Sequence, residues 1–197
     1  MLPTTTLKTL DLDEALARVD DGAAFVDLRP IDDYLQVHVP GSIALLYEFG
    51  PGMAGRARDC LPLELPLLLL SSDNAHMANT AAALRGKGFT VLGRVDHGVN
   101  AWASAKGAPA STEVVTHAAA PDGTLLDVGD PGARRPDSAL HIPIEKLWSR
   151  AADVARDRAV IVVAGFAVRA ALAVGMLERC GRRDIVFWRT RDKVRLL

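Results

Sequence analysis

The sequence has few of the residues from which disulfide frameworks and metal centres are built. It contains 197 residues but only two cysteines, Cys60 and Cys180, and five histidines. Two cysteines are too few for a disulfide framework, and the histidines are scattered rather than spaced as the ligands of a metal site. We therefore expect two free thiols, no metal ion and no cofactor.

Long apolar runs are also missing. The longest leucine-rich segment, residues 61–70, contains Glu64 and is too short to cross a bilayer. The first ten residues lack the charged start and apolar centre of a secretory signal. These absences predict a cytoplasmic protein without a membrane partner.

The formal net charge is only −1, but the charges are unevenly distributed. Residues 1–113 contain 14 acidic and 9 basic residues, and residues 114–197 contain 10 acidic and 14 basic residues, so the two parts carry −5 and +4. The basic part is compatible with an anionic partner such as nucleic acid. Because no aromatic interleaving or nucleic-acid motif accompanies it, we favour two oppositely charged halves that face each other, or a solvated tail.

Residues 66–89 form the most informative segment. Pro66 precedes four leucines, a polar cluster follows at residues 71–76, and an alanine-rich stretch then runs to Gly88. A short apolar run between Pro and a polar cluster predicts a buried parallel strand, and the alanine-rich stretch predicts a helix that ends at glycine. The loop between them faces the N–H groups of a helix start, which is a common place for an anion.

The same pattern occurs twice in the chain. Residues 125–128 (LLDV) repeat residues 25–28 (FVDL) at an offset of 100 residues. An apolar strand at 159–163, a loop at 164–168 and a helix that ends at Gly181 repeat the segment that ends at Gly88, at an offset of 93 residues. A second copy with shorter loops indicates internal duplication, and the alternation of strands and helices predicts an α/β fold with mainly parallel sheets.

The ordered motifs resemble those of tandem rhodanese-like proteins of the sulfurtransferase family. The motifs that carry the resemblance are residues 26–29 (VDLR), 38–42 (HVPGS), 88–89 (GF) and 97–102 (HGVNAW) in the first copy, and residues 126–128 (LDV) and 139–144 (ALHIPI) in the second. The second copy lacks the final glycine-tryptophan motif. The pair is similar to the rhodanese pair that is fused to metallo-β-lactamase-like persulfide dioxygenases. The resemblance implies two rhodanese-like domains, residues 1–112 and 113–197, each a mainly parallel sheet flanked by helices.

The resemblance also implies where a catalytic cysteine would stand. In active family members a cysteine opens the loop and carries sulfur as a persulfide, which requires a thiolate. Here Ser71 and Ala164 occupy the two positions, so we expect no catalytic residue of that kind. The loops remain candidates for ligand binding. Their residues are Ser71, Ser72, Asp73, Asn74, Ala75 and His76 in the first copy, and Ala164, Gly165, Phe166, Ala167, Val168 and Arg169 in the second.

Three hypotheses for the function remain open at this point, and whether the protein is an enzyme is one of the open questions. The first is a catalytically inactive rhodanese-like protein that binds an anionic or sulfur-bearing ligand, or an enzyme of sulfur metabolism. The second is an active sulfurtransferase that uses Cys60, whose pKa the neighbouring arginines Arg56 and Arg58 would lower. The third is a structural module whose loops bind nothing. We interpret Asp27 and Arg29 as a structural pair at a strand end.

The missing cysteines predict that the protein has no thiosulfate:cyanide sulfurtransferase activity above background. A serine hydroxyl at position 71 cannot carry a persulfide, and alanine at position 164 offers no nucleophile. Thiocyanate formation is the measurement. Turnover at a rate typical of enzymes would contradict the prediction, and its loss in Cys60→Ala would favour the second hypothesis.

Overall fold

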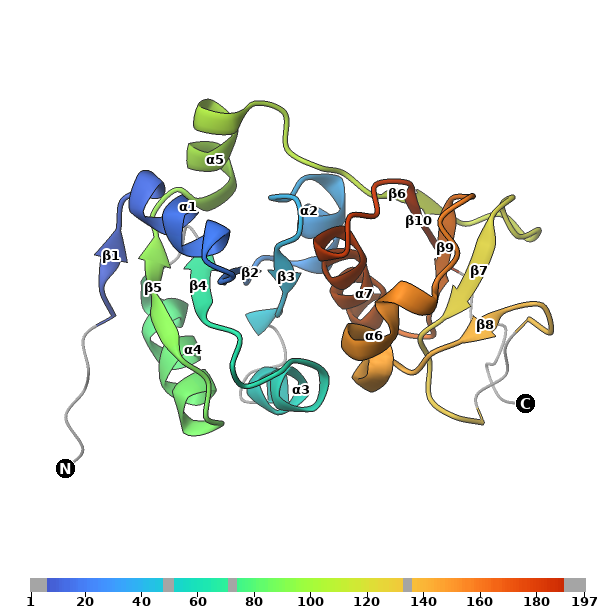
Figure 1. The fold of residues 1–197 in the computed structure, drawn as a ribbon, viewed down its shortest axis with the longest axis horizontal. Helices are drawn as coiled ribbons and strands as arrows, with labels where there is room; N and C mark the ends of the chain where they lie inside the picture. The colour runs from blue at the N-terminus through green and yellow to red at the C-terminus, as the bar shows by residue number, and fades with distance from the viewer. Residues whose placement is uncertain (1–6, 48–51, 71–73, 133–135, 190–197) are drawn as a thin grey trace.

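The protein contains two parallel five-stranded sheets (Figure 1). The computed structural model describes residues 7–47, 52–70, 74–132 and 136–189. In sheet order, the strands of the first sheet are β1 (Thr9–Leu10), β5 (Val91–Val95), β4 (Leu67–Leu70), β2 (Ala24–Asp27) and β3 (Ile43–Ala44). Those of the second sheet are β6 (Glu113–Val115), β10 (Ile185–Trp188), β9 (Val160–Val163), β7 (Thr124–Asp127) and β8 (Leu140–His141). The predicted α/β class with parallel sheets is confirmed.

The two sheets have equivalent strand orders. In each, the first strand along the chain lies at one edge beside the last strand, and the second strand lies between the fourth and the third. The four-residue strands β4 and β9 are both fully buried, as their unbroken apolar sequences require in a sheet covered on both faces. We call residues 7–112 the first unit and residues 113–189 the second unit. The division into two domains at residue 112 stays a prediction.

Helices follow most strands. They are α1 (Leu12–Asp20), α2 (Ile31–Gln36), α3 (Gly52–Cys60), α4 (Asn74–Gly86), α5 (Gly98–Lys106), α6 (Ile144–Arg150), the short 3-10 helix η2 (Ala151–Asp153) and α7 (Ala167–Arg179). The side chain of Asp11 caps α1 by accepting a hydrogen bond from the N–H of Glu14 at 2.8 Å. Within the described residues, no helix has the length and apolar character needed to cross a membrane.

The two units share one hydrophobic core. Helices α2, α3, α6 and α7 lie between the two sheets (Figure 1), and a single apolar cluster runs from Val26 and Leu69 of the first sheet to Val162 and Phe187 of the second. A separate cluster under α1 and α5 covers the other face of the first sheet. The units are therefore packed together through helices of both and do not form two isolated cores.

Helix α7 makes the closest approach between the units. A Cβ atom at Gly175 would lie 2.1 Å from the carbonyl oxygen of Ser42 and 3.1 Å from the hydroxyl of Tyr34. Only glycine fits at this point of the helix, although glycine lowers helix stability relative to alanine by about 1 kcal/mol. The tight approach brings the C-terminal turn of α7 onto residues 38–42 of the first unit.

A cluster of buried hydrogen bonds joins α7 to the first unit at this contact. The ring of His38 is fully buried, with Nε2 3.2 Å from both carboxylate oxygens of Glu178 and Nδ1 2.8 Å from the carbonyl oxygen of Tyr34. Glu178 also accepts a hydrogen bond from the N–H of Gly41 at 2.6 Å. Gly41 has a φ of +74°, a conformation that side-chain-bearing residues rarely adopt. One carboxylate thus fixes both the imidazole and the turn that follows it.

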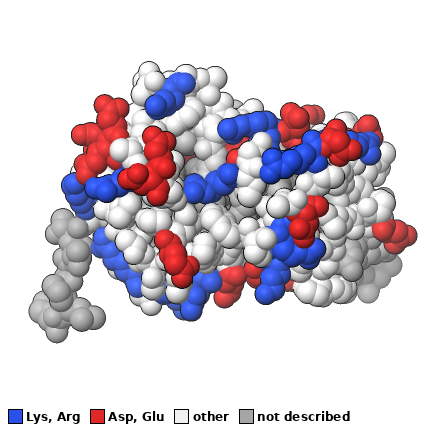
Figure 2. All heavy atoms as spheres, in the orientation of Figure 1, with Lys and Arg blue, Asp and Glu red and all other residues white. Residues whose placement is uncertain are grey.

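The sequence interpretation of this region is partly confirmed. Asp27 and Arg29 do form a structural pair, since Arg29 Nη2 lies 2.7 Å from Asp27 Oδ2 and also donates to the carbonyl oxygen of Val37. Figure 2 shows positive and negative side chains interspersed on the visible face rather than gathered into a large basic patch. Arg189 of the basic part pairs with Asp32 of the acidic part at 2.8 Å, which agrees with two halves of opposite charge.

The cluster predicts a large loss of stability in Glu178→Ala. The substitution leaves two buried donors, His38 Nε2 and the N–H of Gly41, without an acceptor, and each costs roughly 1–3 kcal/mol. We expect the free energy of unfolding in urea to fall by about 3 kcal/mol. Glu178→Gln, which keeps one acceptor oxygen, should lose less.

The matched control is Glu64→Ala. Glu64 is exposed and makes no hydrogen bond or ion pair within the described residues. Equal unfolding free energies for the Glu178 and Glu64 variants would show that the buried cluster does not stabilise the fold.

Candidate functional site

The second loop lies at the carboxyl edge of the second sheet. Strand β9 ends at Val163, and Phe166, with φ −120° and ψ 126°, leads from the loop into α7. The carboxyl ends of parallel strands are where α/β proteins place ligands. The helix begins two residues earlier than the sequence indicated, so Ala167 and Val168 belong to α7. A helix can start beside this apolar loop because its first N–H groups need no hydrogen-bond partner within the helix.

The first loop can be followed only in part. Ser71, Ser72 and Asp73 lie outside the described residues. Asn74 and Ala75, predicted as loop, are the first residues of α4, and their side chains are not described. His76 is exposed on α4, and its ring lies 4.1 Å from that of Tyr47 at an angle of 45°.

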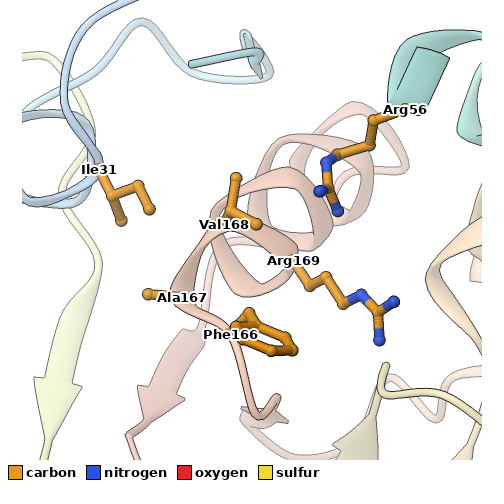
Figure 3. Close-up of a pocket in the computed structure, with 6 residues that line it drawn as sticks. All are labelled: Ile31, Arg56, Phe166, Ala167, Val168 and Arg169. Atoms are coloured by element: carbon orange, nitrogen blue, oxygen red, sulfur yellow. The ribbon is translucent and has the colours of Figure 1, made fainter. Parts of the chain in front are cut away.

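A pocket of about 270 Å³ opens at the start of α7 (Figure 3). The residues that line it are Ile31, Arg56, Phe166, Ala167, Val168 and Arg169. Four of these six were predicted as ligand-binding candidates, whereas Ala164 and Gly165 do not line the pocket. Ile31 on α2 and Arg56 on α3 were not predicted to line a site, because they come from the other unit. The pocket is therefore built by both units.

Arg169 is paired with a carboxylate. Its Nη2 lies 2.6 Å from Asp130 Oδ1, and this hydrogen bond raises the pKa of Arg169 and lowers that of Asp130. The side chain of Arg169 is 14% exposed, and that of Asp130 is 60% exposed. Arg169 Nε is buried and has no hydrogen-bond partner among the described residues. Asp130 thus balances most of the positive charge of Arg169.

Arg56 provides the second positive charge. It is partly buried and extends from α3 towards the start of α7 (Figure 3). It has no hydrogen bond or ion pair within the described residues, although its charge helps to lower the pKa of Asp130. None of the lining residues is a cysteine, serine, lysine or histidine. The described lining residues carry positive charge that suits an anion, and none of them is a nucleophile.

Cys60 does not have the environment of a sulfur carrier. It is the last residue of α3 and is 3% exposed. Burial, followed by the nearby carboxylate of Glu145, raises the pKa of its thiol to about 12, and the opposing effect of Arg56 is smaller. The prediction that neighbouring arginines lower this pKa is therefore wrong, because desolvation of the thiolate outweighs their attraction.

Among the residues that the structure describes, no group of three or more His, Cys, Asp or Glu side chains is arranged to hold a metal ion. Both cysteines are free thiols, as predicted.

The first unit matches a known domain family. Residues 11–105 match the family model described as the rhodanese-like domain. No curated protein matches the sequence. The first half of the chain is therefore similar to a rhodanese-like domain.

Similar solved structures include the following three. The 3-mercaptopyruvate sulfotransferase SseA of Escherichia coli has 17% identity and a TM-score of 0.43, with 93% of this chain and 98% of that chain covered. A thiosulfate sulfurtransferase of Pseudomonas aeruginosa has 16% identity and a TM-score of 0.42, with 92% of this chain and 43% of that chain covered. EanB in complex with hercynine has 13% identity and a TM-score of 0.49, with 95% of this chain and 60% of that chain covered.

The burial of Cys60 predicts slow alkylation in the folded protein. With its pKa raised to about 12, the group is almost entirely a thiol at pH 8, and the thiol is not the nucleophile. Modification by iodoacetamide, followed by mass spectrometry, should be much slower at Cys60 than at the less buried Cys180. The rate at Cys60 should rise as the pH approaches 12.

Protein unfolded in urea is the control, because both thiols are then exposed and should react at similar rates. If Cys60 of the folded protein reacted at pH 8 as fast as in urea, the sulfurtransferase hypothesis based on Cys60 would gain support instead.

Proposed function

We propose that this chain is a rhodanese-like protein of the sulfurtransferase family that binds a small anion, or the anionic group of a sulfur-bearing molecule, without transferring sulfur. The observation that carries the proposal is the guanidinium of Arg56, which has no ion pair within the described residues and lines a pocket whose described lining residues include no nucleophile. The proposal includes the second unit as a shorter rhodanese-like domain, supported by its equivalent strand order.

The electrostatics of the pocket favour an anion. Arg56 and Arg169 bring two positive charges, of which Asp130 balances one. Helix α7 begins in the pocket wall and is 13 residues long, so the partial positive charge of its N-terminus adds to that of Arg56. The buried Nε of Arg169 remains available as a further donor. An anion between Arg56 and the start of α7 would satisfy these groups together.

The same residues argue against sulfur transfer. Ala164, at the position where the family resemblance implies a cysteine, is 3% exposed and has only a methyl side chain. Cys60 is buried and protonated at neutral pH. At position 71, serine provides a hydroxyl that cannot store sulfane sulfur. The protein would therefore hold a ligand, or present it to an enzyme of sulfur metabolism, rather than convert it.

A titration with sulfate or thiosulfate tests the proposal. Amide shifts should move first at residues 164–169, which surround the start of α7. Arg56→Gln should weaken binding about fivefold, because it removes an unpaired charge beside the anion, an effect of roughly 1 kcal/mol. Asp130→Asn should strengthen binding by a similar factor, since it releases Arg169 from its partner.

Arg18→Gln on α1 is the matched control, because it removes the same charge from an exposed position on a helix that does not line the pocket. It should leave the affinity unchanged. If no amide responds at millimolar anion, the pocket is not an anion site and the structural-module hypothesis gives the better account.

A further inference from the structure

Phe166 is unusually exposed for its size. It is 67% exposed, and the only other large apolar side chain exposed in the described part of the chain is Val114, at 37%. Phe166 precedes the first residue of α7, where Ser, Thr, Asp or Asn are preferred as caps, and it makes no capping hydrogen bond with its side chain. Neither core packing nor the start of the helix accounts for a phenyl ring at this position.

The walls beside Phe166 are apolar as well. Ile31 from the first unit and Ala167 and Val168 from the second line the same pocket, so four of the six described lining residues are apolar. In Figure 3 the phenyl ring and the side chains of Ile31 and Val168 surround the start of α7, and Arg56 approaches it from α3. Single exposed apolar residues are common on protein surfaces, but this one is part of a largely apolar pocket beside Arg56, a cation without an ion pair among the described residues.

We infer that the ligand of this pocket is an organic anion with a planar apolar group, of the size of an aryl sulfonate or aryl carboxylate. This inference rests on the proposed anion-binding function and specifies the chemical class of the ligand. The acid group would contact Arg56 and the start of α7, and the ring would pack against Phe166 and the aliphatic side chains of Ile31 and Val168. Aromatic rings pack on each other in offset or edge-to-face geometry.

The size of the pocket agrees with this class. Its volume of about 270 Å³ lies just below the range of roughly 300–1,000 Å³ that is typical of sites for drug-sized molecules. A single ring with one acid group fits that space. An inorganic anion would interact with the positive charges but would leave the phenyl ring of Phe166 and the apolar walls exposed to water. It would therefore gain no free energy from the burial of apolar surface.

The test compares two anions of equal charge, methanesulfonate and benzenesulfonate. Titration by calorimetry or amide shifts should give a dissociation constant about tenfold lower for benzenesulfonate, from ring burial and aromatic packing. Phe166→Ala should remove most of that difference, because it should weaken the binding of benzenesulfonate much more than that of methanesulfonate. Phe166→Trp, which keeps an aromatic surface, should retain the preference.

Val114→Ala is the control, since it truncates the other exposed apolar side chain away from the pocket. It should change neither affinity. Equal affinity of the wild-type protein for the two sulfonates, or an equal loss of both in Phe166→Ala, would overturn the ligand class while leaving the anion site in place. Absence of binding by both sulfonates and by sulfate would overturn the proposed function itself.

Discussion

Helix α7 lies so close to the first unit that position 175 has no room for a side chain, and most other features of the structure follow from that approach. Its N-terminal residues line the pocket, and Glu178 near its C-terminus accepts hydrogen bonds from His38 and Gly41. One helix of 13 residues therefore holds the interface at one end and the candidate site at the other. The position of Phe166 relative to Ile31 and Arg56 depends on how α7 packs against the first unit.

The candidate site combines groups that neither unit provides alone. The second unit supplies the helix start, the exposed ring and a guanidinium that Asp130 largely balances. The first unit supplies the guanidinium of Arg56, which has no ion pair within the described residues, and the aliphatic side chain of Ile31. In the proposed function, the positive charge would attract the acid group of the ligand, and the apolar lining would select the rest of the molecule.

Sequence patterns predicted the parts of the structure that depend on neighbouring residues in the sequence. The unbroken apolar runs at β4 and β9 indicated buried parallel strands, and the repeated motifs indicated two equivalent sheets. The helix starts were displaced by two or three residues, because polar residues and alanine are equally acceptable in a first helical turn. The sequence could not show that Arg56 meets α7 or that Glu178 meets His38, since these contacts join residues of different units.

The case of Cys60 illustrates the same limit. Its nearest neighbours in the sequence include arginines, and on that evidence alone a lowered pKa was expected. The tertiary structure buries the thiol, and the desolvation of its anion then has the larger effect. Burial at a given residue depends on segments far away in the chain, so the direction of this shift could not be read from the local sequence.

The shared core also affects the order in which the chain can fold. During synthesis the first unit leaves the ribosome before α7 exists, and domains that are self-sufficient usually fold at that stage. Here the face of the first unit that carries His38 and Tyr34 has no cover until residue 178 has been made. The nascent chain therefore exposes apolar surface over most of its translation, and contacts of such long sequence separation form slowly. The two units have equivalent strand orders, but the first unit gains its contacts with α7 only after the second has been made.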